Sequence, residues 1–484
     1  MRSDRAEPAH DHNHEQNRFA VIPTAEKLNA DPAYAGGGVT IAFLDSGFYP
    51  HPDFRKRVIA FHDIAGEEPS LQDIAESQAH HWHGTQTVAA CAGDGSLSDG
   101  VYRGLAYKAN LVLVKVSRNG SIGNKEIEDG LVWVIENRSK FGIRILNMSL
   151  GGDRDEPTAE STINQLVEQL IMDGVVVTVA AGNSSDVRSI PPASAPSAIT
   201  VGGYSDENKF SPEDFDLYHS SHGLTADGLV KPELIAPGMY VAAPILPGTS
   251  TYEIAEVLSE LSKAPDYLFG SLLNEIYALA KLGDELLNLD RETARRRIGE
   301  ELIQRKIVAT HYQHVDGTSF AAPIAASVVA QMYEANQLLS PPTVKNILVS
   351  TATRLGGHAA IRQGFGVLNA RSAVDLAKKE IHLNDEVINH APRIFGNEIV
   401  FRFHDDTAER VALVGDLNGW DRQTTLFERS TDGAWEAKIA CQPSGKYRYK
   451  LLIDDSRWTE DPSHGFKEDD GLGGFNSLLQ IERR

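Results

Sequence analysis

The segment Val39-Thr-Ile-Ala-Phe-Leu44 is a short run of apolar and β-branched residues, and Asp45-Ser46-Gly47 follows it directly. Three similar runs come later in the chain, at residues 111–116, 143–148 and 175–180. Runs of this length and composition are typical of strands that are buried on both faces of a sheet. We therefore predict one buried sheet that includes these four segments.

Helical patterns separate these strands. Residues 124–139 and 161–173 are predicted helices, and the second repeats Ile and Leu at helical spacing. Strands that alternate with helices predict an α/β domain whose parallel sheet is covered by helices on both faces. Sites in such sheets lie at the carboxyl ends of the strands, and the polar sequences that begin at Asp45 and Ala181 each follow a strand directly.

The composition narrows the class of protein. Of 484 residues, 41% are apolar and 23% are charged, which is close to an ordinary soluble globular chain of two or three domains. The net charge of −21 argues against nucleic acid as a partner, because phosphates are bound by clustered basic residues. Only Cys91 and Cys441 are available, which excludes a disulfide framework and a zinc site built on cysteine pairs.

The apolar runs and the N-terminal residues indicate in which cellular compartment the protein is expected. The longest apolar run, 321–330, is far shorter than the ~18–20 residues that span a bilayer. Residues 1–20 have no apolar central segment, so we expect a flexible tail and no secretory signal. Its histidines, His10, His12 and His14, are interpreted as solvated, with metal binding as the alternative. We expect a cytoplasmic protein that does not bind a membrane.

Two further regions depart from the alternating pattern. Residues 251–307 carry three apolar stripes at helical spacing, which predict an inserted helical hairpin or small bundle. Residues 391–484 instead hold short alternating segments separated by Gly, Asp, Asn and Pro, which predict an immunoglobulin-like β-sandwich. The predicted organisation is therefore a tail at 1–20, an α/β domain at 21–380 that contains the insertion, and a β-sandwich at 391–484.

Three polar sequences interrupt apolar surroundings, and they are centred on Asp45, His83 and Ser319. A serine hydroxyl attacks a carbonyl only if a base takes its proton, and neutral imidazole is suited to that task. A carboxylate then fixes the imidazole tautomer and stabilises the imidazolium. Each residue alone is more often a turn or cap residue. Together, in the order Asp, His, Ser, they predict a catalytic triad for acyl transfer.

These motifs resemble those of the subtilisin-like serine peptidases, the subtilases. The similarity covers roughly residues 36–376 and rests on several segments: Asp45-Ser-Gly47, His83-Gly-Thr85, Arg103–Ala109, Lys231–Gly238 and Gly317-Thr-Ser-Phe-Ala-Ala-Pro323. It implies a subtilisin-like fold and a serine endopeptidase that acts through an acyl-enzyme intermediate. The short segment before Asp45 and the acidic charge are similar to those of intracellular subtilases.

The resemblance also implies residues that handle the substrate. Asn183 matches the family's oxyanion-hole asparagine and would donate its amide to the developing negative oxygen beside the Ser319 backbone N–H. Ser149, Leu150 and Gly151 match the strand that pairs with an extended peptide, and Gly182, in the segment that bears Asn183, is also expected to contact the substrate. The implied substrate is a protein or peptide in an extended conformation.

No cofactor is expected to take part in the chemistry. Calcium binding is common in the family, and Asp53 with the loop 93–100 offers oxygen ligands. Turn formation is the alternative reading of that loop. The number of residues between Asn183 and Ser319 is about twice that in short subtilases because of the insertion at 251–307. The role of this insertion cannot be transferred from the family.

The C-terminal region resembles the early-set module of isoamylases and branching enzymes, including its glycogen-binding version. In that version two tryptophans stack on glucose rings and polar side chains bind hydroxyl groups. The matching positions here are Trp420, Lys450, Trp458, Leu472 and Asn476. The resemblance implies either binding of glycogen or another α-glucan, or docking against the peptidase domain.

The sequence thus predicts a cytoplasmic serine endopeptidase whose C-terminal module can direct it to an α-glucan. The competing hypothesis is a catalytically silent, glucan-binding scaffold. It is disfavoured because every expected catalytic side chain is present.

Overall fold

The computed structural model describes residues 20–68, 70–380, 392–395, 398–430, 433–464, 466–472 and 474–481. Of the predicted tail at 1–20, all but Ala20 lies outside the described residues. The same holds for residues 381–390, which separate the predicted α/β domain from the predicted β-sandwich, and for Ala391.

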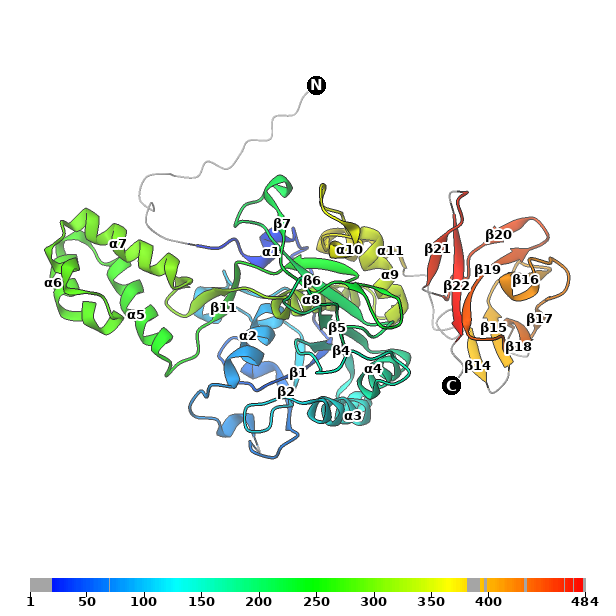
Figure 1. The fold of residues 1–484 in the computed structure, drawn as a ribbon, viewed down its shortest axis with the longest axis horizontal. Coiled ribbons are helices and arrows are strands. Elements are labelled where there is room, and N and C mark those ends of the chain that lie inside the picture. Colours follow the sequence, from blue (N-terminus) through cyan, green and yellow to red (C-terminus); the bar gives the residue numbers. More distant parts are fainter. Residues whose placement is uncertain are drawn as a thin grey trace, which may run out of the picture.

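An eight-stranded sheet forms the centre of the larger domain (Figure 1). Its main path runs β10-β6-β5-β4-β1-β3-β2, and every pair along this path is parallel. Strand β7 pairs with β6 in the antiparallel direction. The strands are β1 (Thr40–Asp45), β2 (Val58–Asp63), β3 (Asn110–Lys115), β4 (Ile143–Met148), β5 (Val176–Ala180), β6 (Ile199–Ser205), β7 (Asp216–Leu217) and β10 (Leu234–Pro237).

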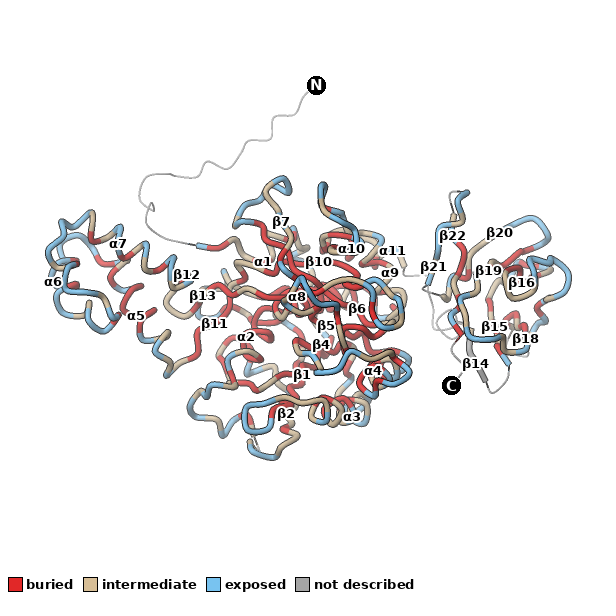
Figure 2. The backbone as a smooth tube through the Cα atoms, viewed as in Figure 1, coloured by how far each residue is buried: buried red, intermediate tan, exposed pale blue. Residues whose placement is uncertain are grey.

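Helices cover both faces of this sheet. Along β1, Ile41 and Phe43 join the cluster that contains α8, whereas Ala42 and Leu44 join the cluster that contains residues of α3 and α4. Figure 2 shows the buried backbone concentrated along the central strands and α8. The helices of this domain are α1 (Thr24–Lys27), α2 (His81–Ala92), α3 (Asn124–Phe141), α4 (Thr162–Met172), α8 (Thr318–Ala335), α9 (Pro341–Thr351), α10 (Ala360–Gln363) and α11 (Ala370–Lys379). The predicted α/β class, with a parallel sheet covered by helices on both faces, is confirmed.

The strand order decides where polar residues gather. Strands β5, β4 and β1 are neighbours, and because they are parallel their carboxyl ends lie at one edge of the sheet. Asp45 ends β1, Ser149 follows β4, and Ala181 follows β5. Three segments that are far apart in the sequence are thereby brought to the same edge, as expected for an α/β site.

The predicted helical insertion contains α5 (Ser250–Lys263), α6 (Asp266–Ile276) and α7 (Arg291–Gln304), which Figure 1 shows grouped together. Their apolar residues form a separate core, but two of them, Leu268 on α6 and Ile303 on α7, do not join it. Leu268 and Ile303 are 43% and 52% exposed, because three short helices offer no surface to cover their outer sides.

A small antiparallel sheet connects the insertion to the main domain. It has the order β11-β13-β12, with strands β11 (Val241–Pro244), β12 (Ile307–Ala309) and β13 (Tyr312–Val315). Strand β12 leaves the insertion, and β13 leads directly into the segment before Ser319. A separate two-stranded ribbon pairs β8 (Gly223–Leu224) with β9 (Val230–Lys231).

The C-terminal region is a β-sandwich, as predicted. One sheet has the order β14-β15-β18-β17 and the other β16-β19-β22-β21, with β20 paired to β19. Residues of both sheets share one core, which includes Phe401 and Tyr449. The strands are β14 (Arg393–Phe395), β15 (Glu398–Phe403), β16 (Val411–Gly415), β17 (Glu428–Arg429), β18 (Trp435–Ala440), β19 (Gly445–Ile453), β20 (Arg457–Thr459), β21 (Lys467–Asp469) and β22 (Phe475–Ile481).

A buried ion-pair group supports the edge of the central sheet. Lys231 is fully buried, and its ammonium lies 2.6 Å from Glu233 Oε1, which also lies 2.8 Å from Lys345 Nζ. Glu233 Oε2 accepts a hydrogen bond from the Thr200 N–H on β6. Burial lowers the pKa of Lys231 to about 8, although the charge of Glu233 raises it. The carboxylate of Glu233 therefore compensates two ammonium groups at once.

We predict that Glu233→Gln lowers the free energy of unfolding by about 3–5 kcal/mol, because it leaves buried ammonium groups without their carboxylate. Urea unfolding followed by circular dichroism measures this change. Glu213→Gln is the matched control, since Glu213 is exposed, and it should change stability by less than about 0.5 kcal/mol. Equal stability of the two variants would contradict the role given to Glu233.

Candidate active site

Asp45 is almost completely buried and is hydrogen-bonded on both carboxylate oxygens. Its Oδ1 lies 2.7 Å from His83 Nδ1 and accepts a second hydrogen bond, also of 2.7 Å, from the Ser46 N–H. Its Oδ2 accepts from the Thr87 hydroxyl at 3.1 Å. The carboxylate is thus held in one orientation, with one oxygen directed at the imidazole.

His83 lies in the first turn of α2, and Thr87 follows it one helical turn later, so both face Asp45. The carboxylate makes Nδ1 the protonated nitrogen, which leaves the lone pair of the neutral ring on Nε2. Burial lowers the pKa of His83, but the charge of Asp45 and its hydrogen bond outweigh burial and hold this pKa above its ordinary value. The pair is arranged to stabilise an imidazolium.

Ser319 is the second residue of α8, immediately after Gly317 and Thr318. Gly317 has φ 142°, a conformation that favours glycine, and its N–H donates to the Gly238 carbonyl at 2.7 Å. The first N–H groups of a helix have no hydrogen-bond partner within the helix, so the Ser319 N–H can donate a hydrogen bond to a ligand.

The first turn of α8 lies beside His83. The ring of Phe320, next to Ser319, has its centroid 6.1 Å from that of the imidazole. Among the described residues, no hydrogen bond joins the Ser319 hydroxyl to His83. The structure therefore brings Asp45 and His83 into direct contact and places Ser319 close to them.

Asn183 is fixed against the same turn. Its Oδ1 accepts from the backbone N–H and the hydroxyl of Thr318, both at 2.9 Å. Because Oδ1 faces two donors, the amide orientation is determined and Nδ2 points elsewhere. A Cβ built at Gly317 would lie 3.7 Å from this Nδ2, so the amide donors are next to the turn that carries Ser319.

One cavity of about 690 Å³ contains most of the residues predicted to handle the substrate. Its lining includes Ser149, Leu150, Gly151, Gly182, Asn183 and Ser319. An ion pair between Arg188 and Asp155 belongs to the same lining and was not predicted. No local pattern marks it, since the two residues come from separate loops.

Two residues that were not among the predicted site residues, Asn147 and Thr318, support the segment that carries Ser319. The Ser149 hydroxyl donates to the Ser319 carbonyl at 2.7 Å and accepts from the Asn147 amide at 3.0 Å. Thr318 holds Asn183, and its hydroxyl also accepts from the Gly182 N–H at 3.2 Å. Thr318 belongs to the quoted motif, so its place beside Ser319 was the available signal.

The residues predicted as calcium ligands are hydrogen-bonded within the protein. Asp53 is completely buried, and its carboxylate accepts from the hydroxyls of Tyr312, at 2.9 and 3.1 Å, and Ser96, at 3.0 Å. In the loop 93–100, Asp94 Oδ1 accepts from the Ser96 N–H at 2.9 Å. These contacts fit the turn interpretation of the loop, and calcium binding there stays a prediction.

In the β-sandwich, three of the predicted sugar-binding residues, Lys450, Trp458 and Asn476, share one sheet face. Lys450 and Leu452 lie on the same face of β19, and Trp458 pairs with Leu452 across the neighbouring strand. The register that pairs Tyr449 with Ser477 also puts Lys450 opposite Asn476. This face is the one turned away from the sandwich core.

The exposure of these side chains differs. Trp420, Trp458 and Leu472 are 41%, 39% and 92% exposed, whereas Asn476 is buried at 8%. Lys450 Nζ lies 2.5 Å from Asp470 Oδ2, and the Arg422 guanidinium lies 5.1 Å from the centroid of the Trp458 ring. Asn476 therefore presents little surface to a ligand, and the Lys450 ammonium is paired with Asp470.

Comparisons with known proteins agree with the motifs. Residues 36–367 match the family described as the Subtilase family, and residues 388–463 match Carbohydrate-binding module 48 (Isoamylase N-terminal domain). The chain is 31% identical to the serine protease AprX of Bacillus subtilis over 70% of this chain and 66% of that protein. It is also 36% identical to subtilisin-like protease 2 of Pseudogymnoascus destructans over 45% of this chain and 49% of that protein.

A third relative, the M-protease of Shouchella clausii, is 28% identical over 70% of this chain and 64% of its own length. The chain thus spans between about half and two thirds of these three relatives. Within the part that the structure describes, no helix has the length and hydrophobicity to cross a bilayer. Since the family match extends over more than half of the residues, the chain belongs to the subtilase family.

Proposed function

We propose that this protein is a serine endopeptidase that hydrolyses peptide bonds through Asp45, His83 and Ser319. The observation that carries the proposal is the 2.7 Å contact between buried Asp45 and His83, beside a helix that begins with Ser319. A carboxylate, an imidazole and a hydroxyl in this arrangement are the groups that acyl transfer requires. The family membership supports the same reaction.

In the first half of the reaction, the Ser319 hydroxyl attacks the scissile carbonyl while His83 Nε2 takes its proton. The resulting oxyanion accepts hydrogen bonds from the Ser319 N–H and the Asn183 Nδ2. His83 then gives the proton to the leaving amine, and an acyl-enzyme forms. In the second half, His83 activates water in the same way and the acyl-enzyme is hydrolysed. No step requires a metal or a cofactor.

The substrate is an extended peptide. Ser149, Leu150 and Gly151 directly follow β4 and line the cavity that also holds Ser319. A peptide that adds to this segment as a strand would place its scissile carbonyl at the helix start, and side chains would enter the cavity beside Gly182. The net charge of −21 is consistent with a protein substrate and not with nucleic acid.

We further propose that the C-terminal module directs the enzyme to an α-glucan such as glycogen. The support is the match of residues 388–463 to a carbohydrate-binding module and the exposure of Trp420 and Trp458. Indole faces pack against the apolar faces of sugar rings. Cys91 and Cys441 are not joined in a disulfide, which is consistent with a reducing compartment such as the cytoplasm.

A fluorophosphonate probe, which reacts with activated serines, should label the wild-type chain and not Ser319→Ala. Ser350→Ala on α9 is the matched control and should be labelled like the wild type, since Ser350 lies outside the cavity. Labelling is read by gel fluorescence, with casein digestion as the activity measurement. Equal labelling of Ser319→Ala and wild type would refute the nucleophile and favour the silent scaffold.

Asn183→Ala should lower kcat by about 10²–10³-fold with little change in KM, because the amide acts on the oxyanion and not on the bound peptide. Asp45→Asn should lower kcat by about 10⁴-fold, since it loses the carboxylate that sets the tautomer. Steady-state hydrolysis of a chromogenic peptide measures both. A loss confined to KM in Asn183→Ala would contradict its oxyanion role.

The double variant Trp420→Ala/Trp458→Ala should lose co-sedimentation with glycogen while its peptide hydrolysis is unchanged. The matched control is Trp82→Ala, because Trp82 is similarly exposed, at 48%, but lies on α2. Sedimentation of the double variant at the wild-type level would show that these two rings do not bind the glucan.

A further inference from the structure

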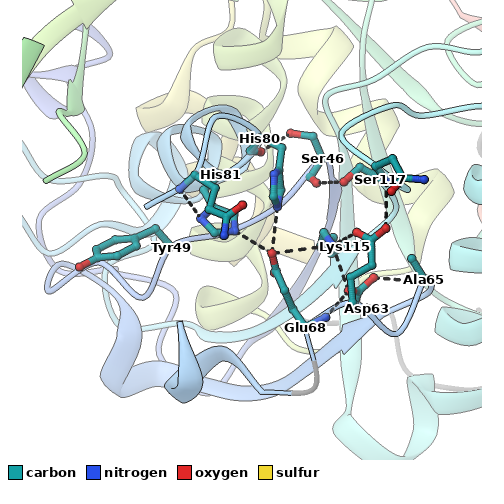
Figure 3. A network of polar contacts seen from close by, with 12 residues as sticks. Ser46, Tyr49, Asp63, Ala65, Glu68, His80, His81, Lys115 and Ser117 are labelled. Atoms are coloured by element: carbon teal, nitrogen blue, oxygen red, sulfur yellow. Dashed lines mark hydrogen bonds and ion pairs between the residues drawn. The ribbon is translucent and has the colours of Figure 1, made fainter. Parts of the chain in front are cut away.

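Three metal-binding side chains converge beside α2, outside the residues used for catalysis. Glu68 follows β2, and His80 and His81 stand at the start of α2. Glu68 Oε1 lies 2.9 Å from His80 Nε2 and 2.9 Å from His81 Nε2, and all three ligand atoms are within 4.8 Å of one another. Figure 3 shows both imidazoles directed at the same carboxylate.

The charges around this group do not balance. The buried Lys115 ammonium lies 3.0 Å from Asp63, 2.8 Å from Glu67 and 3.8 Å from Glu68. Three carboxylates thus surround one ammonium, which leaves two negative charges when the imidazoles are neutral. Buried or half-buried charge without compensation is costly, and one divalent cation would supply the missing charge.

One oxygen at the centre of the group has no partner. Glu68 Oε2 is buried and accepts no hydrogen bond from the described residues, although Oε1 of the same carboxylate faces three donors. A buried carboxylate oxygen normally accepts at least one hydrogen bond. An ion held by Glu68 through one or both oxygens would account for it.

We propose that Glu68, His80 and His81 bind one divalent transition-metal ion such as zinc or cobalt. Two imidazoles and a carboxylate form a ligand set that suits these ions and leaves a fourth position for water. In a tetrahedral site with bonds near 2.0–2.1 Å, neighbouring ligand atoms are roughly 3.3 Å apart. The 2.9 Å separations therefore need to open by only a few tenths of an ångström.

The protons can be accounted for. Without metal, His81 Nδ1 accepts from the Gln78 N–H at 3.0 Å, so the proton of the neutral ring is on Nε2 and is donated to Glu68. Metal binding takes the lone pair of Nε2, which moves this proton to Nδ1 and breaks the contact with Gln78. The loop that carries Gln78 must therefore shift when the ion binds.

A metal ion at this site would stabilise the position of α2, the helix that carries His83. The ion would join Glu68, from the segment after β2, to the first turn of α2, two residues before the catalytic imidazole. The Ser46 hydroxyl donates to the His80 carbonyl at 2.9 Å, and the Ser46 N–H donates to Asp45. The binding itself does not depend on the proposed peptidase activity.

Cobalt titration of the full-length chain tests the site, with Ser319→Ala present to prevent self-digestion. We expect one equivalent of Co²⁺ to produce visible d–d absorption, and Zn²⁺ to abolish it by displacement. Glu68→Gln, His80→Gln and His81→Gln should each weaken the affinity by at least about 100-fold, because residues that merely orient a metal ligand already contribute 10–100-fold. Absence of d–d absorption from the parent chain would refute the site.

Two controls separate this site from other histidines. Replacement of His10, His12 and His14 by Gln, and separately His358→Gln, should leave the absorption and the stoichiometry unchanged. Loss of binding in the tail variant but not in His80→Gln would assign the metal to residues 1–20 and overturn the proposal. Circular dichroism confirms folding, and His80→Gln is decisive if buried His81→Gln does not fold, since the His80 side chain is 18% exposed.

Discussion

A carboxylate that is almost completely buried has to be hydrogen-bonded on both oxygens, and this requirement organises the edge of the sheet that carries the candidate triad. Asp45 meets it with a backbone N–H and two side chains of α2, His83 and Thr87. Since those two residues are four apart, one face of α2 has to be turned towards the end of β1. The orientation of the imidazole is thus a consequence of burying the carboxylate.

The position of Ser319, the proposed nucleophile, depends on a second set of contacts that involve mostly the backbone. Thr318 and Ser319 are held by Asn183 and Ser149, which follow neighbouring strands β5 and β4. Strand β12 follows the last helix of the insertion and pairs with β13 in the small sheet. Strand β13 then leads directly into the turn before Ser319. The helical insertion therefore reaches the nucleophile through two short strands.

The sequence was informative where a pattern is local. Runs such as 39–44 gave the strands, helical spacing gave α4 and α5, and three short motifs gave the candidate triad. Contacts that join distant residues could not be predicted, because no periodicity connects Arg188 to Asp155 or Glu68 to His81. The exposure of Leu268 was missed for a related reason: a stripe predicts an apolar face, but not whether anything covers it.

The candidate triad and the cluster around Glu68 are not independent. Asp45 and Lys115 are partners in the register of β1 and β3, so a buried anion and a buried cation end adjacent strands. Ser46 lies between the two groups: its N–H donates to Asp45, its hydroxyl donates to the His80 carbonyl, and its own carbonyl accepts from the Ser117 hydroxyl. Hydrogen bonds made by the hydroxyl and the N–H of Ser46 therefore link His80 in the cluster to the carboxylate of the candidate triad.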